Sequence, residues 1–553
     1  MDYEKLADLL FPTIDKDLEY YENLYPKRDL KDGAIVTRFA PSPTGFLHMG
    51  SVFTSVCACN LAKKSGGKYI LRIEDTDQKR LVPGAIELIV SGLKKYGVDF
   101  DEGMDENGND FGNYGPYKQS QRKELYMAMA KHLVKMGRAY PCFCDEEVLN
   151  ADRQVQEANK ELIGYYGNYA HCRDLTLEEV KENLAKGKKF CIRYRCESNS
   201  NKKVIVHDAV RGKLILSDNF MDVVILKSDF LPPYNFAHVC DDHFMRMNLV
   251  VRGDEYLPSI TQHIQLFQAM GFEPIQYAHL APIQKMDNGS RRKISKRKDP
   301  EADVQFYVQE GYPLESVKEY LLTIANSNYE DWHKQNPDLS CSDFEVKFDK
   351  MSISGALFDM PKLVDVSKTV ISKFTAEHVY EDVLEWAKEY DKELFNLLSE
   401  KRDFSIKMFS IERGTQKPRK DIGKWGDVKE IYSYFFNELY SPTKESFVFD
   451  SRFSTADIVD ILTEYEKTYD STVEKQDWFN NIKVISKKFG FADDMKAYKA
   501  NPENYKGHYG DVSSIIRMGL TTRSQTPDMF DICKLFGEKE VARRMELCCN
   551  LIK

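Results

Sequence analysis

The stretch from residue 34 to residue 96 constrains the fold most, because it alternates short β-prone runs with helical patterns. Residues 34–39 and 69–73 are typical of strands, whereas residues 52–64 and 83–96 are typical of helices. A strand–helix–strand–helix order predicts a parallel sheet covered by helices. We therefore expect an α/β domain of the doubly wound, Rossmann-like type.

The pattern changes twice further along the chain. Residues 114–222 break the alternation with a Tyr/Gly-rich stretch and a β-like run near residues 190–195, which predicts an inserted α+β domain. Alternation returns from residue 223, with a strand expected at 223–226. Beyond about residue 300 amphipathic helical stretches dominate, as at 379–390, 458–469 and 528–551, which predicts an all-α C-terminal half.

A length of 553 residues allows about three to five domains. The predicted order is an N-terminal helical extension (1–32), the first half of the Rossmann-like domain (33–113), the insertion (114–222), the second half of the Rossmann-like domain (223–285), a connector that carries a basic loop (286–370) and an α-helical domain (371–553).

Charge and cysteine content limit the partners and the cellular compartment that the protein can have. With 78 Lys+Arg against 87 Asp+Glu the net charge is −9, which is unlike a chain whose whole surface binds nucleic acid. The sum averages over domains, however, so a basic face on one of them is compatible with it. There is no apolar run long enough to cross a membrane and no secretory signal, and the 12 cysteines form no disulfide framework. We expect a cytoplasmic protein with reduced thiols.

The first chemical motif runs from Arg38 to Ser51 and follows the first predicted strand, at the sheet edge where ligands bind in such folds. His48 can donate to a phosphate oxygen, and Gly50 lets a ligand approach the backbone. The N-terminus of the following helix favours an anion. Taken alone, the motif is also compatible with a proline-rich turn at residues 41–45 and an incidental histidine.

The second motif is KISKRK at residues 293–298, which follows Arg291 and Arg292. Taken alone, it is either a solvated basic loop or a mobile loop whose ammonium groups neutralise a polyphosphate in a transition state.

Together the motifs resemble glutamyl-tRNA synthetase, a class I aminoacyl-tRNA synthetase, in its bacterial type with a helical anticodon-binding region. The likeness covers nearly everything after residue 33. It is carried by RFAPSPTGFLHMGS, YILRIEDTDQKR with VPGA after it, GPYKQSQR, LKSDFLPPYNFAHVCDDH, VVRGDEYLPS and KISKRKD, and later by FDMPKL and YKGHYGDVSSIIRMGLTTRSQTPDMFDI. The helical C-terminal half differs from the β-barrels that glutaminyl-tRNA synthetase resembles there.

The resemblance implies a glutamate pocket in which Arg38 meets the side-chain carboxylate and Glu74 holds the α-ammonium group. It also implies further pocket positions, namely Ala40, Ser42, Tyr234, His238 and Arg252. His238 stands where many members carry asparagine, so it is either a ligand contact or a structural histidine. Asp75 and Asp77 are expected to be helix-capping or solvated acids.

The resemblance further implies ATP-dependent ligation of L-glutamate to the 3′ end of tRNA(Glu) through glutamyl-adenylate, with Mg²⁺ accompanying ATP. His48, Lys293 and Lys296 are the implied catalytic residues. The implied ATP-binding residues are Ser42, His48, Gly50, Lys293, Ser295 and Lys296. A non-discriminating enzyme would also glutamylate tRNA(Gln) for later amidation. We expect a monomer that binds no membrane.

Three other classes of protein compete with this interpretation. Other adenylyl-transferring enzymes of the same fold are short, and a truncated relative that modifies a tRNA base would end near residue 300. A non-catalytic tRNA-binding paralogue should have lost His48 or the lysine loop, and this chain keeps both.

By resemblance, residues 114–222 would hold the tRNA acceptor stem and could carry zinc on Cys142, Cys144 and Cys172. The fourth ligand is open, with His171 and Asp174 as neighbours, and reduced free cysteines are the alternative.

The helical half would read the anticodon. Its basic patch at residues 417–420, with Lys424 and Trp425 close by, would contact phosphate and stack a base, or else is a solvated helix end.

Overall fold

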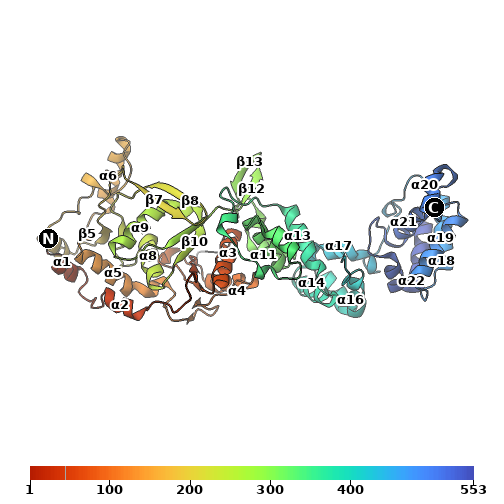
Figure 1. Cartoon of the computed structure of the whole chain (residues 1–553), viewed down its shortest axis with the longest axis horizontal. Helices are drawn as coiled ribbons and strands as arrows, with labels where there is room; N and C mark the ends of the chain where they lie inside the picture. Colours follow the sequence, from red (N-terminus) through yellow and green to blue (C-terminus); the bar gives the residue numbers. More distant parts are fainter. Residues whose placement is uncertain (44, 46) are drawn as a thin grey trace. The chain divides into compact units, whose positions relative to one another are not determined.

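The computed structural model describes residues 1–43, 45 and 47–553. Thr44 and Phe46, which belong to the first motif and in part to the predicted turn, lie outside the described residues. The chain forms two compact units (Figure 1). The N-terminal unit comprises Met1–Phe306 and Lys318–Asp359, and the C-terminal unit comprises Tyr307–Val317 and Met360–Lys553.

Parallel strands with intervening helices form the centre of the N-terminal unit, as predicted. β1 (Val36–Phe39) pairs in parallel with β2 (Lys68–Leu71), and β10 (Leu249–Gly253) pairs in parallel with β11 (Gln276–Leu280). Asn248, just before β10, joins the two pairs because its N–H donates to the Val36 carbonyl oxygen at 3.1 Å and its side chain accepts from the Val36 N–H at 2.8 Å. The α/β, doubly wound fold class is thereby confirmed.

The connecting helices follow the hydrophobic patterns of the sequence. α3 (Met49–Ser65) links β1 to β2, is buried on most sides, and ends at Gly66, whose φ of 71° is a left-handed cap. α4 (Ala85–Lys95) is amphipathic and buries Ile89 and Leu93. α8 (Tyr234–Phe244) precedes β10, and α9 (Ile260–Ala269) links β10 to β11.

The segment predicted as an insertion contributes to two sheets. β5 (Ala139–Cys142) and β6 (Cys191–Tyr194) are antiparallel, and β6 also pairs antiparallel with β9 (Val224–Leu226). The strand predicted at 223–226 therefore belongs to this antiparallel sheet, and our placing it in the parallel alternation was wrong. A short buried apolar run looks the same in either kind of sheet, so the sequence does not distinguish them.

A β-hairpin from the same segment joins the parallel strands instead. β7 (Lys203–Asp208) and β8 (Gly212–Ser217) form the hairpin, and Asp208 pairs with Tyr277 of β11. The resulting strand order is β10-β11-β7-β8. The turn end of the hairpin thus lies against β11.

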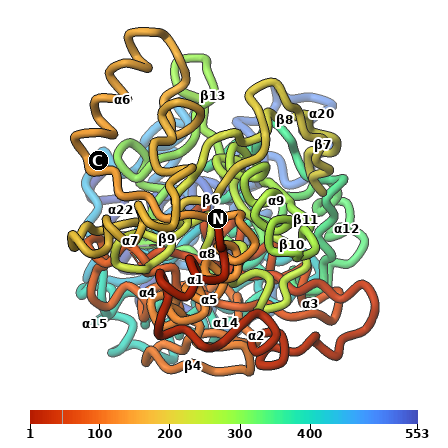
Figure 2. The backbone as a smooth tube through the Cα atoms, turned by 90° about the vertical axis from the view of Figure 1, so that its left-hand side faces the viewer, coloured from red at the N-terminus to blue at the C-terminus, as the bar shows by residue number. Residues whose placement is uncertain are grey.

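The N-terminal extension is helical and packs on the unit, as expected. α1 (Tyr3–Leu10) buries Leu6 and Leu10 in the core that contains α5 (Lys123–Lys135), and Figures 1 and 2 show α1 beside α5. α2 (Leu18–Leu24) follows. Arg28 then forms an ion pair with Glu102, with nitrogen–oxygen distances of 2.6 and 3.1 Å.

The chain up to Gln335 contains several further strands and helices. They are β3 (Gly103–Met104), β4 (Asp110–Phe111), α6 (Glu146–Ala158), α7 (Leu177–Ala185), β12 (Gln284–Asp287), β13 (Ser290–Lys293), α10 (Val304–Glu310), α11 (Leu314–Ala325) and α12 (Tyr329–Gln335).

The C-terminal unit is helical and contains no strand among its described residues, which confirms the predicted all-α half. Its helices are α13 (Met360–Ser372), α14 (Ala376–Tyr390), α15 (Lys392–Glu400), α16 (Arg402–Ser410), α17 (Val428–Tyr432), α18 (Thr455–Thr468), α19 (Lys475–Lys488), α20 (Met495–Ala500), α21 (Tyr509–Thr521) and α22 (Met529–Ile552). The helix predicted at 528–551 breaks at Gly537, where φ is 75°. Within the described part of the chain, no helix is long and apolar enough to cross a membrane.

Candidate active site and metal centre

A cavity of about 590 Å³ opens at the carboxyl ends of β1 and β10 in the N-terminal unit. It brings together most of the predicted site residues, namely Arg38, Ala40, Ser42, His48, Gly50, Glu74, Tyr234, Arg252 and Lys293. His238, Ser295 and Lys296 do not line it. The cavity therefore joins both motifs, which lie about 250 positions apart in the sequence.

The cavity wall also contains residues to which the sequence analysis assigned no role. Thr54, Glu255 and Tyr256 line it. Glu255 and Tyr256 lie within the quoted motif VVRGDEYLPS, so the motif marked the correct segment without identifying these side chains.

Buried charges hold Arg38 in place. Its Nε lies 3.3 Å from both carboxylate oxygens of Asp242, and the fully buried Arg72 also bonds Asp242. Burial opposes ionisation of Asp242, but the Arg38 and Arg72 guanidinium groups outweigh it and lower its pKa. Asp242 is thus a carboxylate that fixes the orientation of Arg38.

Arg72, which bonds Asp242, also bonds Glu74, because its Nη2 donates to Glu74 Oε1 at 3.0 Å. Burial raises the pKa of Glu74 although the Arg72 and Arg38 guanidinium groups oppose the shift. A cation that entered the cavity beside Glu74 would compensate for this burial and favour the charged carboxylate.

His238 lies behind Arg38 and does not face the cavity. Its Nδ1 is 3.3 Å from Arg38 Nη2 and 3.2 Å from an oxygen of Asp242, and its Nε2 is 3.0 Å from Tyr277 Oη. Burial first, and then the Arg252 and Arg38 charges, hold the pKa of His238 well below its usual value. The structure therefore favours the structural alternative for this histidine, as a neutral ring.

Arg252 and Tyr234 form a second wall of the cavity. Arg252 Nη1 donates to Tyr234 Oη at 3.1 Å, and burial raises the pKa of Tyr234 to about 12. Tyr234 is therefore a neutral hydroxyl at physiological pH, and Arg252 supplies positive charge at this side.

His48 is the N-cap of α3. Its Nδ1 accepts a hydrogen bond from the Gly50 N–H at 2.9 Å, so the ring proton is on Nε2. Burial, together with the Lys296 and Lys293 ammonium groups, lowers the pKa of His48. A Cβ on residue 50 would lie 3.2 Å from His48 Nδ1, a tight contact that a small shift of the imidazole ring would relieve.

The lysine loop follows the β12–β13 hairpin. Lys293 Nζ lies 3.4 Å from Glu255 Oε1, and Lys296 Nζ lies 3.9 Å from Asp303 Oδ2. The Ser295 N–H donates to Asp299 Oδ2 at 2.9 Å, which anchors the loop. Arg292 bonds the same carboxylate and lowers the pKa of Asp299 to about 2.

Asp75 and Asp77 behave differently from each other. Asp75 is buried and accepts hydrogen bonds from the N–H and the hydroxyl of Ser120 at 2.7 and 2.6 Å, so it is not a solvated acid but caps the first turn of the 3₁₀ helix Gln119–Arg122 from a distant position. Asp77 is exposed and pairs with Arg80 at 2.6 Å. The capping alternative therefore agrees with Asp75, although the helix that it caps lies 45 residues away.

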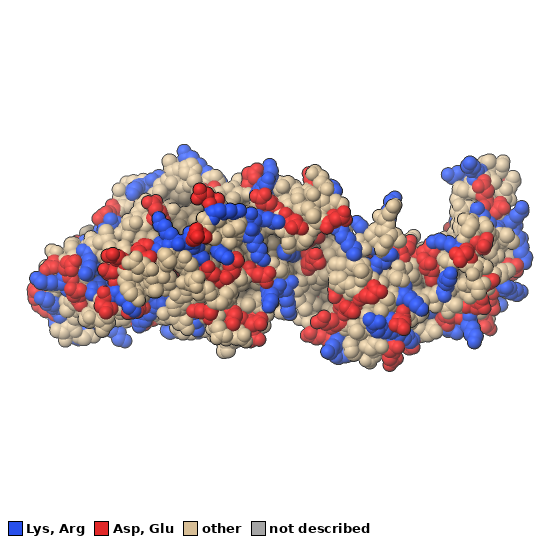
Figure 3. Space-filling model, turned by 60° about the horizontal axis from the view of Figure 1, so that its bottom comes forward, with Lys and Arg blue, Asp and Glu red and all other residues tan. Residues whose placement is uncertain are grey.

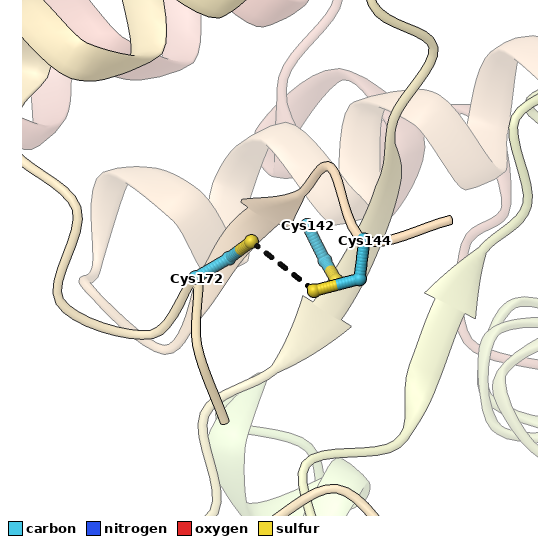
Figure 4. Close-up of side chains that lie close together, drawn as sticks. All are labelled: Cys142, Cys144 and Cys172. Atoms are coloured by element: carbon cyan, nitrogen blue, oxygen red, sulfur yellow. Dashed lines mark hydrogen bonds between the residues drawn. The ribbon is translucent and has the colours of Figure 1, made fainter. Parts of the chain in front are cut away.

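The three predicted metal-binding cysteines lie together (Figure 4). The sulfurs of Cys142, Cys144 and Cys172 are all within 4.8 Å of one another, and those of Cys144 and Cys172 are 3.6 Å apart. Hydrogen bonds from Cys144 and Cys172 lower the pKa of Cys142. Three converging thiols, one of them favoured as a thiolate, match the donor set of a tetrahedral metal site.

Tyr165 lies beside the cysteine cluster. Its Oη lies 3.4 Å from the sulfurs of both Cys142 and Cys144. The two neighbours considered from the sequence have other partners, since His171 bonds Asp152 at 2.9 Å and Asp174 bonds Arg195 at 2.9 Å.

The basic patch of the C-terminal unit differs from its predicted form. Trp425 is only 5% exposed and packs in the core, so it is not available to stack a base. Lys424 is paired with Glu310, and Lys420 donates to the Thr369 hydroxyl at 3.0 Å. Figure 3 shows basic and acidic side chains interspersed over the face it displays, which agrees with the modest net charge.

Comparisons with known proteins agree with this geometry. Residues 34–353 match the catalytic domain of class I tRNA synthetases (E and Q). The chain is 48% identical over 547 residues to a glutamate–tRNA ligase of Acetivibrio thermocellus, covering 99% of this chain and 100% of the relative. It is 47% identical over 546 residues to that of Clostridium perfringens, with 99% and 100% covered. A crystal structure of glutamate–tRNA synthetase from Elizabethkingia anophelis superposes with a TM-score of 0.72 at 26% identity, covering 93% of this chain and 99% of that one.

Proposed function

Because the chain belongs to the class I tRNA synthetases for glutamate and glutamine, we propose that the cavity at Arg38 and His48 is its glutamate and ATP site. The reaction is the ATP-dependent ligation of glutamate to tRNA, the activity named for full-length relatives at 47–48% identity. The observation that carries the assignment is the convergence of Arg38, Glu74, His48 and Lys293 on one cavity.

The charges of the cavity suit glutamate. The Arg38 guanidinium can meet the side-chain carboxylate with two parallel hydrogen bonds, and Asp242 fixes its orientation. Glu74 would hold the α-ammonium group, and this cation would offset the burial of its carboxylate. Tyr234, Arg252, Ala40 and Ser42 complete the proposed pocket. Glutamine lacks the charge that Arg38 would recognise.

Catalysis rests on alignment and charge neutralisation. The glutamate α-carboxylate attacks the α-phosphate of ATP, which gives glutamyl-adenylate and pyrophosphate. Because this carboxylate is already ionised, no general base is required. The Nε2–H of His48 would donate to the α-phosphate, while Lys293 and Lys296 would neutralise the polyphosphate. Ser295 and Gly50 would shape the same site, and Mg²⁺ bound with ATP would share in the neutralisation. A hydroxyl of the terminal ribose of the tRNA then attacks the acyl carbon and releases AMP.

The cysteine cluster would hold one structural Zn²⁺. Cys142, Cys144 and Cys172 supply three sulfurs, and the position of Tyr165 makes its Oη a better fourth donor than His171 or Asp174. Purified protein should contain one zinc per chain by elemental analysis, and Cys172→Ser should lose it. Cys196→Ser, which alters a buried cysteine outside the cluster, should retain it. Metal-free wild-type protein with reactive thiols would support the reduced-cysteine alternative.

We further propose that two regions contact tRNA. Residues 114–222 would bind the acceptor stem, and the C-terminal unit would bind the anticodon. A second cavity, of about 670 Å³, supports the latter, because Phe479 and Arg517 line it and offer an aromatic ring and a cation to an unpaired base. None of the 12 cysteines, all of them described by the structure, forms a disulfide, which supports a cytoplasmic setting. We retain the monomer as the proposed state.

Aminoacylation of purified tRNA(Glu) and tRNA(Gln) by the full chain, with glutamate and glutamine supplied separately, tests the function. Glutamate should be attached to tRNA(Glu). Attachment of glutamine but not glutamate would overturn the assignment. Attachment of glutamate to both tRNAs would establish the non-discriminating form.

A further inference from the structure

Two buried residues outside the cavity hold the Arg252 guanidinium from behind. Arg252 Nε donates to His279 Nε2 at 2.9 Å, and His279 Nδ1 lies 2.6 Å from Asp208 Oδ2. Asp208 and His279 are 4% and 0% exposed, and Arg252 is 5% exposed. The three side chains therefore form a chain of hydrogen bonds that leads from the β7–β8 hairpin to the cavity wall.

The surroundings of Asp208 decide which ring nitrogen of His279 carries the proton. The carboxylate also accepts from the backbone N–H groups of His279, Val210 and Arg211, at 3.1, 3.0 and 2.9 Å. Burial raises the pKa of Asp208, but the hydrogen bond from His279 and those of the backbone outweigh it and lower the pKa. An ionised carboxylate offers no proton, so His279 must donate through Nδ1.

With its proton on Nδ1, His279 presents a lone pair on Nε2. Arg252 needs such an acceptor, because a guanidinium has donors only. The other tautomer, or a protonated ring, would bring two N–H groups face to face. Burial lowers the pKa of His279 and the Arg252 charge adds to this, although the hydrogen bond to Asp208 opposes it, so the ring is neutral.

We propose that Asp208 and His279 are positioning residues for amino-acid binding, which fix the tautomer of His279 and thereby the orientation of Arg252. While His279 holds Nε of Arg252, Nη1 of the same guanidinium donates to Tyr234 Oη at 3.1 Å on the cavity wall. The inference rests on the proposed function, in which Arg252 belongs to the glutamate pocket. It adds a tautomer-determining pair that lies outside the pocket itself.

The hairpin contacts this side of the pocket in a second place. Arg211, at the turn, donates from Nη2 to Asp254 Oδ2 at 2.7 Å and from Nε to the His279 carbonyl oxygen at 3.3 Å. Asp254 follows Gly253, which lines the cavity. The turn of the hairpin thus supports the loop after β10 as well as His279.

Asp208→Asn tests the pair, because every neighbour of the carboxylate is a donor. An asparagine has one oxygen and one NH₂ group, so the NH₂ must face either the backbone N–H groups or His279. We expect the KM for glutamate to rise about ten-fold, as for an interaction left unpaired in a buried site. The kcat at saturating glutamate and the KM for ATP should change less than about two-fold, because the phosphate site is not touched.

Asp218→Asn is the matched control. Asp218 directly follows β8 of the same hairpin, is 6% exposed and accepts from Ser198 and Gln265 at 2.6 Å each, without touching His279. It should leave the KM for glutamate unchanged. An equal rise in both variants would overturn the proposal.

A double-mutant cycle separates positioning from a structural role of Asp208 in the turn. His279→Gln has no tautomer to set, and its amide oxygen can still accept from Arg252. Adding Asp208→Asn to His279→Gln should therefore raise the KM for glutamate less than about two-fold further. Additive effects would overturn the inference.

¹⁵N NMR of histidine-labelled, ligand-free protein tests the tautomer even if Asp208→Asn fails to fold. The His279 resonance, identified by its loss in His279→Gln, should show the Nδ1–H form in wild type. An Nε2–H form there would overturn the positioning pair, whereas failure of the wild type to bind glutamate would overturn the proposed function.

Discussion

The same three-residue pattern begins one helix in each unit. His48-Met-Gly50 starts α3 in the N-terminal unit, and His508-Tyr-Gly510 starts α21 in the C-terminal unit. In both, the histidine is the N-cap and its Nδ1 accepts from the glycine N–H, at 2.9 and 3.0 Å. The H-x-G pattern is therefore first of all a helix cap, with the second ring nitrogen left for another partner.

The surroundings of the two caps differ. His48 borders the 590 Å³ cavity, and the ammonium groups of Lys296 and Lys293 act on it. His508 instead shares a capping box with Asp511, whose carboxylate accepts from the His508 N–H at 2.8 Å, and its ring packs on Tyr498. The local motif thus builds the cap in both units, whereas residues far away in the sequence set the electrostatic surroundings of His48.

The largest difference between the two caps should appear when the lysine near each histidine is replaced. We expect Lys296→Ala to slow ATP–pyrophosphate exchange about 10²–10³-fold, since one lost donor to developing charge commonly has this effect. tRNA binding should persist. Lys506→Ala, two residues before the other cap and paired with Asp457, should leave exchange unchanged. Normal exchange in Lys296→Ala would remove the proposed role of that lysine.

Replacing each cap histidine by asparagine should have the next largest effect. Asparagine is a good N-cap, so both helices should remain capped and the melting temperature should stay within a few degrees. His48→Asn loses the Nε2–H and should reduce the kcat/KM of activation about 10–100-fold, as for a hydrogen bond to a charged group. His508→Asn should keep wild-type activation. Equal activity of the two variants would break the comparison.

Replacing Gly50 and Gly510 by alanine should destabilise the two caps to different extents. A Cβ at residue 510 would lie 2.7 and 2.8 Å from ring atoms of His508, against 3.2 Å from His48 Nδ1 at residue 50. Gly510→Ala should therefore displace its cap and cost about 1 kcal/mol more than Gly50→Ala, since both gain the same helix propensity. Hydrogen exchange at the first turns of α3 and α21 measures this. Greater loss of protection in α3 would contradict it.

Acid should act on the first cap in a defined direction. A proton on Nδ1 of His48 would face the Gly50 N–H, and burial with Lys296 and Lys293 already lowers the pKa of this ring. Below about pH 6.5 the His48 imidazole binds a proton more readily in the unfolded chain than in the folded protein. The free energy of unfolding therefore decreases as the pH falls from about 6.5 towards the lowered pKa of the folded protein. In Lys296→Ala the NMR titration of His48 should move to higher pH, and in Lys506→Ala it should not. A titration unmoved by Lys296→Ala would contradict the electrostatic cause.

Much of the fold could be predicted because its signals are local. The alternation between residues 34 and 96 became β1, α3, β2 and α4, and the amphipathic stretches after residue 300 became helices. The exceptions depended on distant partners. The strand at 224–226 looked like any short apolar run, but β6 captured it in an antiparallel sheet, and the core of the C-terminal unit enclosed Trp425.

The candidate site shows the same division. The resemblance carried by the motifs implied a common site for Arg38, Glu74, His48 and Lys293, and these four residues line one cavity. The motifs did not indicate that Asp242 orients Arg38, since these residues lie 204 positions apart. Nor did they indicate Tyr165 as the partner of the three cysteines.

The sequence by itself determined the order of strands and helices, and its likeness to a known family indicated the proposed reacting groups. These properties depend on hydrophobic period, turn chemistry and side-chain functional groups, which act over a few residues. Only the tertiary structure decided that the Lys296 and Lys293 charges act on His48, and that Asp208 reaches Arg252 through His279. Burial, charge and tautomer depend on which distant side chains meet in space, and a local pattern carries no information about that.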